Sequence, residues 1–265
     1  MLKKFSGFIL YILITILVIS LYAGKYGSLE RLNLRMQDEM FKLRGSISPQ
    51  KDIVIVGLDE KTLDRIGKWP WPHDALAQLI FIISSGSPKV LAVDIFLPED
   101  IDEDTSGRTE LLADEIYDAG NVILPIYFNL SEVGMSPTPS PSAVLGSALA
   151  KVNNLDLKGF VSAKQIYSPD ELLVQSASDF GHINITYDPD DLIRRELTLI
   201  EYDGYLYPSL ALQTARRYLE IDKKEIGLMK KGVINLESIL IPTDKKKQMR
   251  INYHGPNLTF DRVSA

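Results

Sequence analysis

An alternation of strand-like and helix-like patterns early in the chain most constrains its fold. Residues 53–58 form a β-rich apolar run that stops at the carboxylates Asp59 and Glu60. Apolar residues at helical spacing come next, and a second apolar run, 90–93, stops at Asp94. Strand, helix and strand over about 45 residues predict a right-handed parallel βαβ unit whose strands are buried on both faces.

The carboxylates that end these two runs form the first candidate site. The carboxyl ends of neighbouring parallel strands meet at one edge of a sheet, where open α/β sheets bind their ligands. We therefore expect Asp59, Glu60 and Asp94 to lie together, where they orient a polar ligand or a divalent cation. The alternative is structural, because an aspartate directly after a strand also caps a following helix or turn.

Two tryptophans lie between these runs, and each of them precedes a proline. A residue before proline is held out of the helical region, so residues 69–72 predict a stiff, extended connection. Trp69 and Trp71 either form an aromatic wall for a ligand or bury their large apolar surfaces in the core. Both interpretations stay open at this point.

The rest of the chain continues the α/β pattern and then changes character. Helical spacing over 109–119 and an apolar run over 122–126 extend the predicted layer. In the second half, alternating runs flank the dipeptide Asp203-Gly204, which is a strong hairpin signal, and a helix follows Pro208. We predict an α/β layered domain with a largely parallel central sheet that is extended by antiparallel strands.

Two consecutive arginines follow the acidic turn at 188–191. Side chains alternate along a strand, so one of Arg194 and Arg195 faces inward and the other outward. An arginine here either recognises the carboxylate or phosphate of a ligand or forms a structural ion pair with an acidic side chain.

The N-terminus predicts a membrane anchor. Lys3 and Lys4 precede an uncharged apolar stretch, 5–22, of about 18 residues, near the lower limit for a membrane-spanning helix. Basic residues on the short leading side favour export of the chain beyond this stretch, and a cleavable signal peptide is the alternative. We predict a single-pass inner-membrane protein with a transmembrane helix over 1–23, a juxtamembrane helix over 24–45 and an extracytoplasmic domain over 46–265.

The juxtamembrane segment carries apolar residues at three- and four-residue steps. They are Leu29, Leu32, Met36, Met40 and Leu43. This stripe either pairs with its copy in a homodimer, as a signalling stalk, or packs on the chain's own domain.

The composition and the absence of motifs narrow the function. The chain has no cysteine, which excludes disulfides, thiolate metal sites and thiol catalysis. Its net charge of -6 argues against binding of nucleic acid, which needs a basic face. No common catalytic or phosphate-binding motif occurs, so we predict no enzymatic activity and no cofactor. The acidic run 98–104 is either a cation site or a solvated loop.

Several blocks of the sequence resemble the CHASE2 family of extracytoplasmic sensor domains. They are DIVIVGLDEKTL with WPWP, GHINITYDPDDLIRR with YPSLALQTAR, and RINYHGPNLTFDRVSA, in the order that the family has them. The resemblance covers residues 29–265. The chain departs from the family at His73, where arginine is common, and at Asp191, where glycine is usual.

The resemblance implies the sensory domain of a bacterial transmembrane receptor that responds to a small molecule or an envelope stimulus. The usual output domain, a cytoplasmic nucleotide cyclase or kinase, is absent from this chain. The chain is therefore either a truncated receptor, a fragment, or a stand-alone product that regulates a separately encoded partner. The competing hypothesis is a periplasmic metal-dependent hydrolase that uses Asp59, Glu60 and Asp94. The candidate ligand-binding residues are Asp59, Glu60, Asp94, Trp69, Trp71 and Arg194.

Overall fold

The computed structural model describes residues 11–16, 18–20, 27–97, 106–131, 142–151, 159–228 and 233–265. The chain divides into two compact units. Unit 1 comprises Met1–Ile55, Tyr187–Leu192 and Asn252–Arg262, and unit 2 comprises Val56–Thr186, Ile193–Ile251 and Val263–Ala265.

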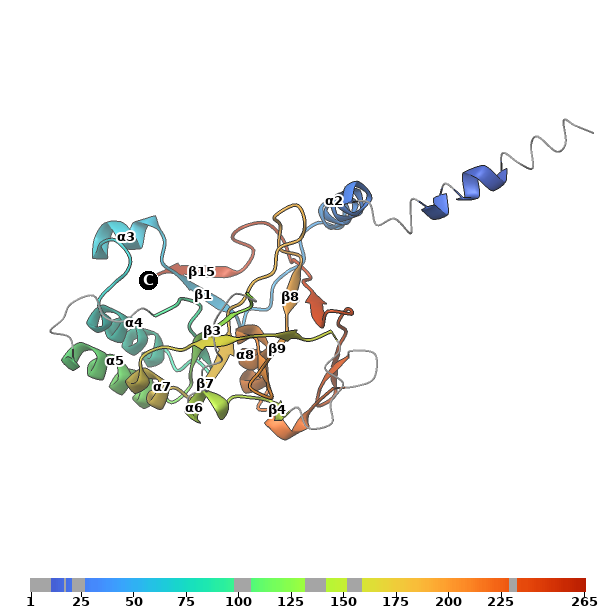
Figure 1. The fold of residues 1–265 in the computed structure, drawn as a ribbon. Coiled ribbons are helices and arrows are strands. Elements are labelled where there is room, and N and C mark those ends of the chain that lie inside the picture. The colour runs from blue at the N-terminus through green and yellow to red at the C-terminus, as the bar shows by residue number, and fades with distance from the viewer. Residues whose placement is uncertain are drawn as a thin grey trace, which may run out of the picture. The chain divides into compact units, whose positions relative to one another are not determined.

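Unit 1 contains the long helix that was expected over 24–45. Helix α2 (Gly27–Arg44) is labelled in Figure 1. The Phe41 ring meets Tyr253 edge to face with the ring centroids 6.5 Å apart, and Arg44 Nη1 donates to Asn252 Oδ1 at 2.6 Å. The end of α2 is therefore held by residues that lie far away in the sequence.

Five apolar side chains of α2 are exposed. They are Leu29, Leu32, Met36, Met40 and Leu43. At about 100° per residue, they share an arc of roughly 80° on the face opposite Leu34 and Phe41. Leu34 is buried. Both interpretations of the stripe, pairing with a second copy or packing on the chain's own domain, stay predictions.

Half of the predicted membrane segment, 5–22, lies outside the described residues. Residues 11–16 and 18–20 within it are helical. Among the helices of the described part of the chain, none combines the length and apolar character needed to cross a bilayer.

Unit 2 is built on a mixed sheet centred on β3 (Val122–Asn129), which is almost entirely buried. Strands β2 (Leu91–Ala92) and β7 (Asp179–His182) run parallel to β3, and β6 (Gln165–Tyr167) runs antiparallel to it. The structure therefore confirms a mixed α/β fold with both parallel and antiparallel pairing.

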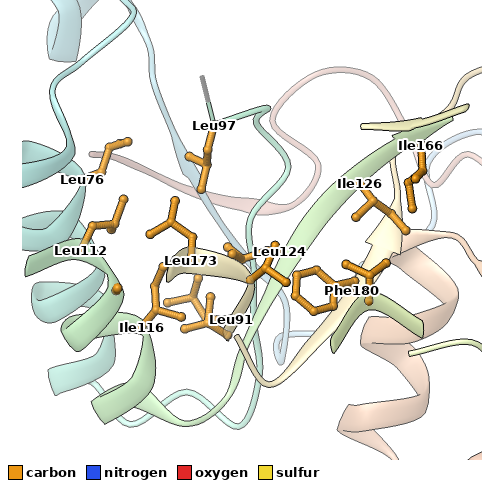
Figure 2. Close-up of a cluster of buried hydrophobic side chains, with 14 of the residues drawn as sticks. Leu76, Leu91, Leu97, Leu112, Ile116, Leu124, Ile126, Ile166, Leu173 and Phe180 are labelled. Carbon is orange, nitrogen blue, oxygen red and sulfur yellow. The ribbon is translucent and has the colours of Figure 1, made fainter. Parts of the chain in front are cut away.

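Three helices pack together and share one apolar cluster with alternate residues of β3. They are α4 (His73–Ser85), α5 (Ser106–Ala119) and α7 (Glu171–Ser176). Figure 2 shows Leu76, Leu112 and Leu173 of these helices gathered around the strand residues Leu91 and Leu124. The helix expected between the first two apolar runs and the helix expected over 109–119 are thus confirmed, and their apolar faces form part of the main core.

The predicted pairing of the first two strands is wrong. β1 (Val54–Gly57) pairs with β15 (Asp261–Ser264), whereas β2 pairs with β3. The side chains of Ile53, Val54 and Ile55 are 50%, 55% and 45% exposed, so this apolar run is not buried on both faces. An apolar, β-rich composition favours a strand, but its pairing partner is set by residues at the other end of the sequence.

The turns of the second half follow the prediction. Asp203 and Gly204 have φ values of 49° and 76° and join β9 (Leu199–Tyr202) to β10 (Tyr205–Pro208) in an antiparallel hairpin. Asp191 has a φ of 61°, the left-handed conformation that favours glycine, so aspartate at this position keeps the turn.

The other elements complete the small sheets and connections. They are α3 (Glu60–Ile66), α6 (Ser142–Leu145), η1 (Lys223–Glu225), β4 (Ala150–Lys151), β5 (Val161–Ser162), β8 (Arg195–Leu197), β11 (Ile226–Leu228), β12 (Ile234–Leu236), β13 (Ile239–Ile241) and β14 (Gln248–Arg250).

Helix α8 (Leu210–Tyr218) lies across the central sheet from α4 and α5, against β7 and β3 (Figure 1). Its approach depends on Gly181 in β7. A Cβ atom at Gly181 would lie 2.5 Å from Leu210 Cα and 2.7 Å from Leu210 N. Such distances are shorter than real Cβ contacts, so only glycine allows the start of α8 to lie this close to the strand.

We predict that Gly181→Ala lowers the free energy of unfolding of the full chain by about 1–3 kcal/mol, because backbone atoms must move to admit the methyl group. Urea unfolding followed by tryptophan fluorescence measures the change. The control is Gly107→Ala in α5, where nothing lies within 4 Å of the added Cβ. Helix propensity makes that variant neutral or up to about 1 kcal/mol more stable. The opposite ranking of the two variants would contradict the close approach.

Candidate functional site

Asp59 is occupied by contacts within its own chain. Its Oδ1 accepts hydrogen bonds from Thr62 N at 3.1 Å and from Thr62 Oγ1 at 2.9 Å. Its Oδ2 accepts from Ser264 Oγ at 2.8 Å. Asp59 therefore caps α3 and fastens it to the end of β15, which confirms the structural interpretation of this carboxylate.

The other two carboxylates of the predicted cluster are placed differently. Glu60 begins α3 and is exposed. Asp94 follows β2, and partial enclosure by the protein raises the pKa of its carboxyl above the usual value. Because β1 and β2 belong to different sheets, the strand pairing that would bring Asp94 beside Asp59 and Glu60 is absent. A ligand site shared by the three carboxylates stays a prediction, but the strand pairing from which it was inferred is not formed.

The described residues contain no group of three or more histidine, aspartate or glutamate side chains that is arranged to hold a metal ion. The metal-dependent hydrolase hypothesis needed such a group at the strand ends. The acidic run 98–104, the other candidate cation site, lies outside the described residues.

The two tryptophans have different surroundings. Trp71 is buried in the main core, and its Nε1 donates to Gly67 O at 2.9 Å. Trp69 is exposed and lies edge to face against Trp71, with the centroids 6.0 Å apart. Trp71 thus packs and anchors the connection, and only Trp69 offers a face to solvent.

The two arginines after the acidic turn divide as the alternation predicted. Arg194 is buried, and Arg195 is half-buried with its Nε 3.8 Å from Asp244 Oδ2. Arg194 O also accepts from Ile251 N at 3.0 Å. Recognition of a ligand by Arg194 stays a prediction.

A buried network that the sequence did not single out lies at the start of β7. Asp179 Oδ1 accepts hydrogen bonds from Ser147 Oγ and from Gln213 Nε2, both at 2.5 Å. Asp179 Oδ2 accepts from Arg216 Nη2. Arg216 also donates from Nε to Gln213 Oε1 at 3.1 Å and from Nη1 to Ile221 O at 3.0 Å. Each charge in this ion pair therefore has several hydrogen-bond partners, as burial requires.

Burial of the ion pair between Arg216 and Asp179 shifts the pKa of the arginine. Loss of hydration lowers the pKa of Arg216 below its usual value, and the attraction of Asp179 opposes this shift. The side chains of Arg216 and Asp179 are only 6% and 2% exposed. The pair is thus a structural joint between β7 and α8.

A cleft of about 550 Å³ opens beside this network. Four cationic and two acidic side chains line it, together with Val90 and Ile221. The charged residues are Lys89, Arg216, Arg217, Lys223, Glu220 and Asp222. Several basic groups therefore converge here beside the buried carboxylate of Asp179.

Two of the cleft's cations approach Asp179 without a hydrogen bond to it. Arg217 Nε lies 3.9 Å from Asp179 Oδ2, and Lys223 Nζ lies 3.7 Å from Oδ1. Lys223 Nζ donates instead to Gly146 O. Both cations therefore lie within ion-pair distance of the buried carboxylate but do not donate a hydrogen bond to it.

A second unusual group lies at the other end of β7. His182 is buried, and neither ring nitrogen has a hydrogen-bond partner among the described residues. Loss of hydration lowers its pKa to about 3. Its backbone bridges to Ser209, whose hydroxyl donates to Glu196 Oε1. The imidazole contacts neither side chain by a hydrogen bond, so the nucleophile–base contact of a serine hydrolase is not formed here.

The blocks that carry the resemblance have structural roles around these groups. Asn184 Oδ1 accepts from Phe128 N at 2.9 Å, and its Nδ2 donates to Phe128 O at 2.7 Å, which continues the pairing with β3 through a side chain. Ser209 Oγ accepts from Leu212 N at 3.1 Å and caps α8. These residues fix the carboxyl end of β7 and the start of α8.

One signal in the sequence pointed to the network. Gln213 and Arg216 lie three positions apart in α8, on the side that buries Leu212. Two polar residues on the apolar side of a short helix need a buried partner. The sequence does not identify Asp179 as that partner, because it lies in a different element.

The similarity of this chain to known proteins lies at the level of a family. The model of the family described as "CHASE2 domain" matches residues 12–265, nearly the whole chain. No curated protein and no solved structure matches.

We predict that burial of neutral His182 makes stability depend on pH. Below about pH 6.5 the unfolded chain binds a proton at this histidine that the folded chain excludes down to a pKa of about 3. The free energy of unfolding should therefore fall by about 1.4 kcal/mol per pH unit from this group as the pH drops. His182→Leu removes that contribution, so urea unfolding between pH 6 and pH 4 should give a shallower slope than in the unaltered chain. Equal slopes in the two proteins would contradict the assignment.

Proposed function

Because this chain belongs to the CHASE2 family of extracytoplasmic sensor domains, we propose that it is the sensory part of a bacterial transmembrane receptor. The family match over residues 12–265 is the observation that carries the proposal. A cytoplasmic cyclase or kinase is the output that the family arrangement suggests.

Membrane attachment is supported by the N-terminal segment. Exposed apolar side chains cover the described helical residues there, and they include Leu13, Ile14, Ile16, Val18 and Ile19. Such a surface is stable in contact with lipid and unfavourable in water. With Lys3 and Lys4 on the cytoplasmic side, the part of the chain that follows the apolar stretch 5–22 lies outside the cytoplasm.

The absence of cysteine allows a direct test of this topology. We predict that Lys224→Cys, at an exposed position of η1, reacts with a membrane-impermeant maleimide on intact spheroplasts. The control is Leu2→Cys, which precedes the apolar stretch 5–22 and should react only after permeabilisation. If Lys224→Cys also required permeabilisation, the domain would be cytoplasmic and the sensor proposal would fail.

Helix α2 supports a paired stalk as the route by which the receptor signals. Leu29, Met36 and Leu43 recur at seven-residue steps on the exposed stripe, and this is the spacing of a coiled-coil seam. A second copy of the chain, anchored in the same membrane, presents the same stripe in parallel. The stimulus would then act by changing the geometry of the α2 pair.

We predict that Met36→Cys forms an intermolecular disulfide in native membranes under mild oxidation, because residues at a coiled-coil seam bring their Cα atoms within disulfide range. The matched control is Arg35→Cys, which is also exposed but lies about 100° from the centre of the stripe. Non-reducing gel electrophoresis gives the dimer fraction. Similar cross-linking at both positions would indicate random collision and contradict a paired stalk.

A further inference from the structure

Arg217 offers the cleft beside α8 a set of unused donors. Its side chain is 37% exposed, and its guanidinium forms no hydrogen bond with any described residue. A guanidinium carries five N–H donors in a planar fork that matches the geometry of carboxylate and phosphate groups. This fork lies in the wall of the cleft.

Lys223 contributes a second cation from a different element. It begins η1, and its ammonium donates to Gly146 O. An ammonium has three donors, so two remain for another acceptor. Arg217 near the end of α8 and Lys223 in η1 thus reach the same cleft from separate segments.

Hydrogen bonds within the chain fix the backbone segments that carry the two cations. Ile221 N donates to Arg216 O at 3.1 Å, and Arg216 Nη1 donates to Ile221 O at 3.0 Å, which fastens the connection between α8 and η1. Asp222 caps η1 by accepting from Lys224 N at 2.9 Å. Fixed donors reduce the entropy that a ligand loses on binding.

We propose that this cleft binds a small ligand through a carboxylate or phosphate group, which is held between Arg217 and Lys223. The proposal rests on the sensory function, since it names the ligand class to which the sensor would respond. No part of it uses Asp59, Glu60 or Asp94.

The charge and size of the cleft define the ligand. Lys89 Nζ lies 2.9 Å from Glu220 Oε1, and Asp222 accepts the hydrogen bond that caps η1. These two carboxylates offset part of the positive charge of the residues that line the cleft. Asp179 below the floor offsets Arg216. The remaining positive charge suits one acidic group and not a polyanion such as nucleic acid. The volume of about 550 Å³ lies within the range of ordinary small-molecule sites, about 300–1,000 Å³.

Thermal unfolding of the purified full chain in detergent tests the proposal. Inorganic phosphate and succinate are the probes, and chloride at equal ionic strength is the reference. We expect the midpoint of unfolding to rise with millimolar probe and not with chloride, because a ligand that binds only the folded state stabilises it. Arg217→Gln and Lys223→Gln should weaken the apparent affinity by about tenfold or more.

Lys224→Gln is the matched control, because it removes the same charge from the exposed neighbour of Lys223, which does not line the cleft. It should respond to the probes as the unaltered chain does. Arg217→Lys keeps the charge but loses the fork, and it should bind with intermediate affinity. A response to one probe alone supports the site and identifies the acidic group.

The proposal is overturned if neither probe raises the midpoint, or if all the variants respond equally. An equal midpoint of Arg217→Gln and the unaltered chain without added anion shows that the variant is folded. The maleimide labelling that tests the topology is independent of this outcome, so the ligand class can fail while the sensory function stands.

Discussion

The buried ion pair between Asp179 and Arg216 is the interaction on which the arrangement of unit 2 depends. It ties the first residue of β7 to the last turns of α8, and it recruits Ser147 and Gln213 as further partners. A pair of this kind adds little net stability compared with apolar packing, but the loss of one partner leaves an uncompensated buried charge that costs about 3–5 kcal/mol. Its main effect is therefore on the specificity of the fold, because any other register of β7 against α8 would leave an unpaired charge in the core.

Local chemistry was enough to predict most of the helices and turns. The spacing in α4 and the Asp203-Gly204 hairpin depend on residues within a few positions of each other, so the sequence displays them directly. The partner of β1 was not predictable in this way. A run of β-branched residues specifies an extended backbone, but its pairing with β15 is a contact between the two ends of the sequence.

The same limit applies to the sites. The position of Asp59, directly after an apolar strand, is compatible with two roles: a ligand contact and a helix cap. The cap is decided by Thr62 and Ser264, of which only the first is close in sequence. The cleft depends on Lys89, Arg217 and Lys223, which belong to separate segments with no shared motif. In the sequence, none of these cations can be distinguished from an ordinary surface lysine or arginine.

The four residues of β7 connect these features. One end of the strand is fixed by an ion pair with several partners, and the other end carries His182, whose imidazole has no hydrogen-bond partner among the described residues. Between them, Gly181 allows the start of α8 to touch the strand backbone. Movement of α8 would therefore be resisted at its last turn by Arg216 and at its first turn by backbone contact. An anion between Arg217 and Lys223 would compete for two of the cations that now face Asp179. It can favour a different position of α8 only to the extent that it binds that position more tightly.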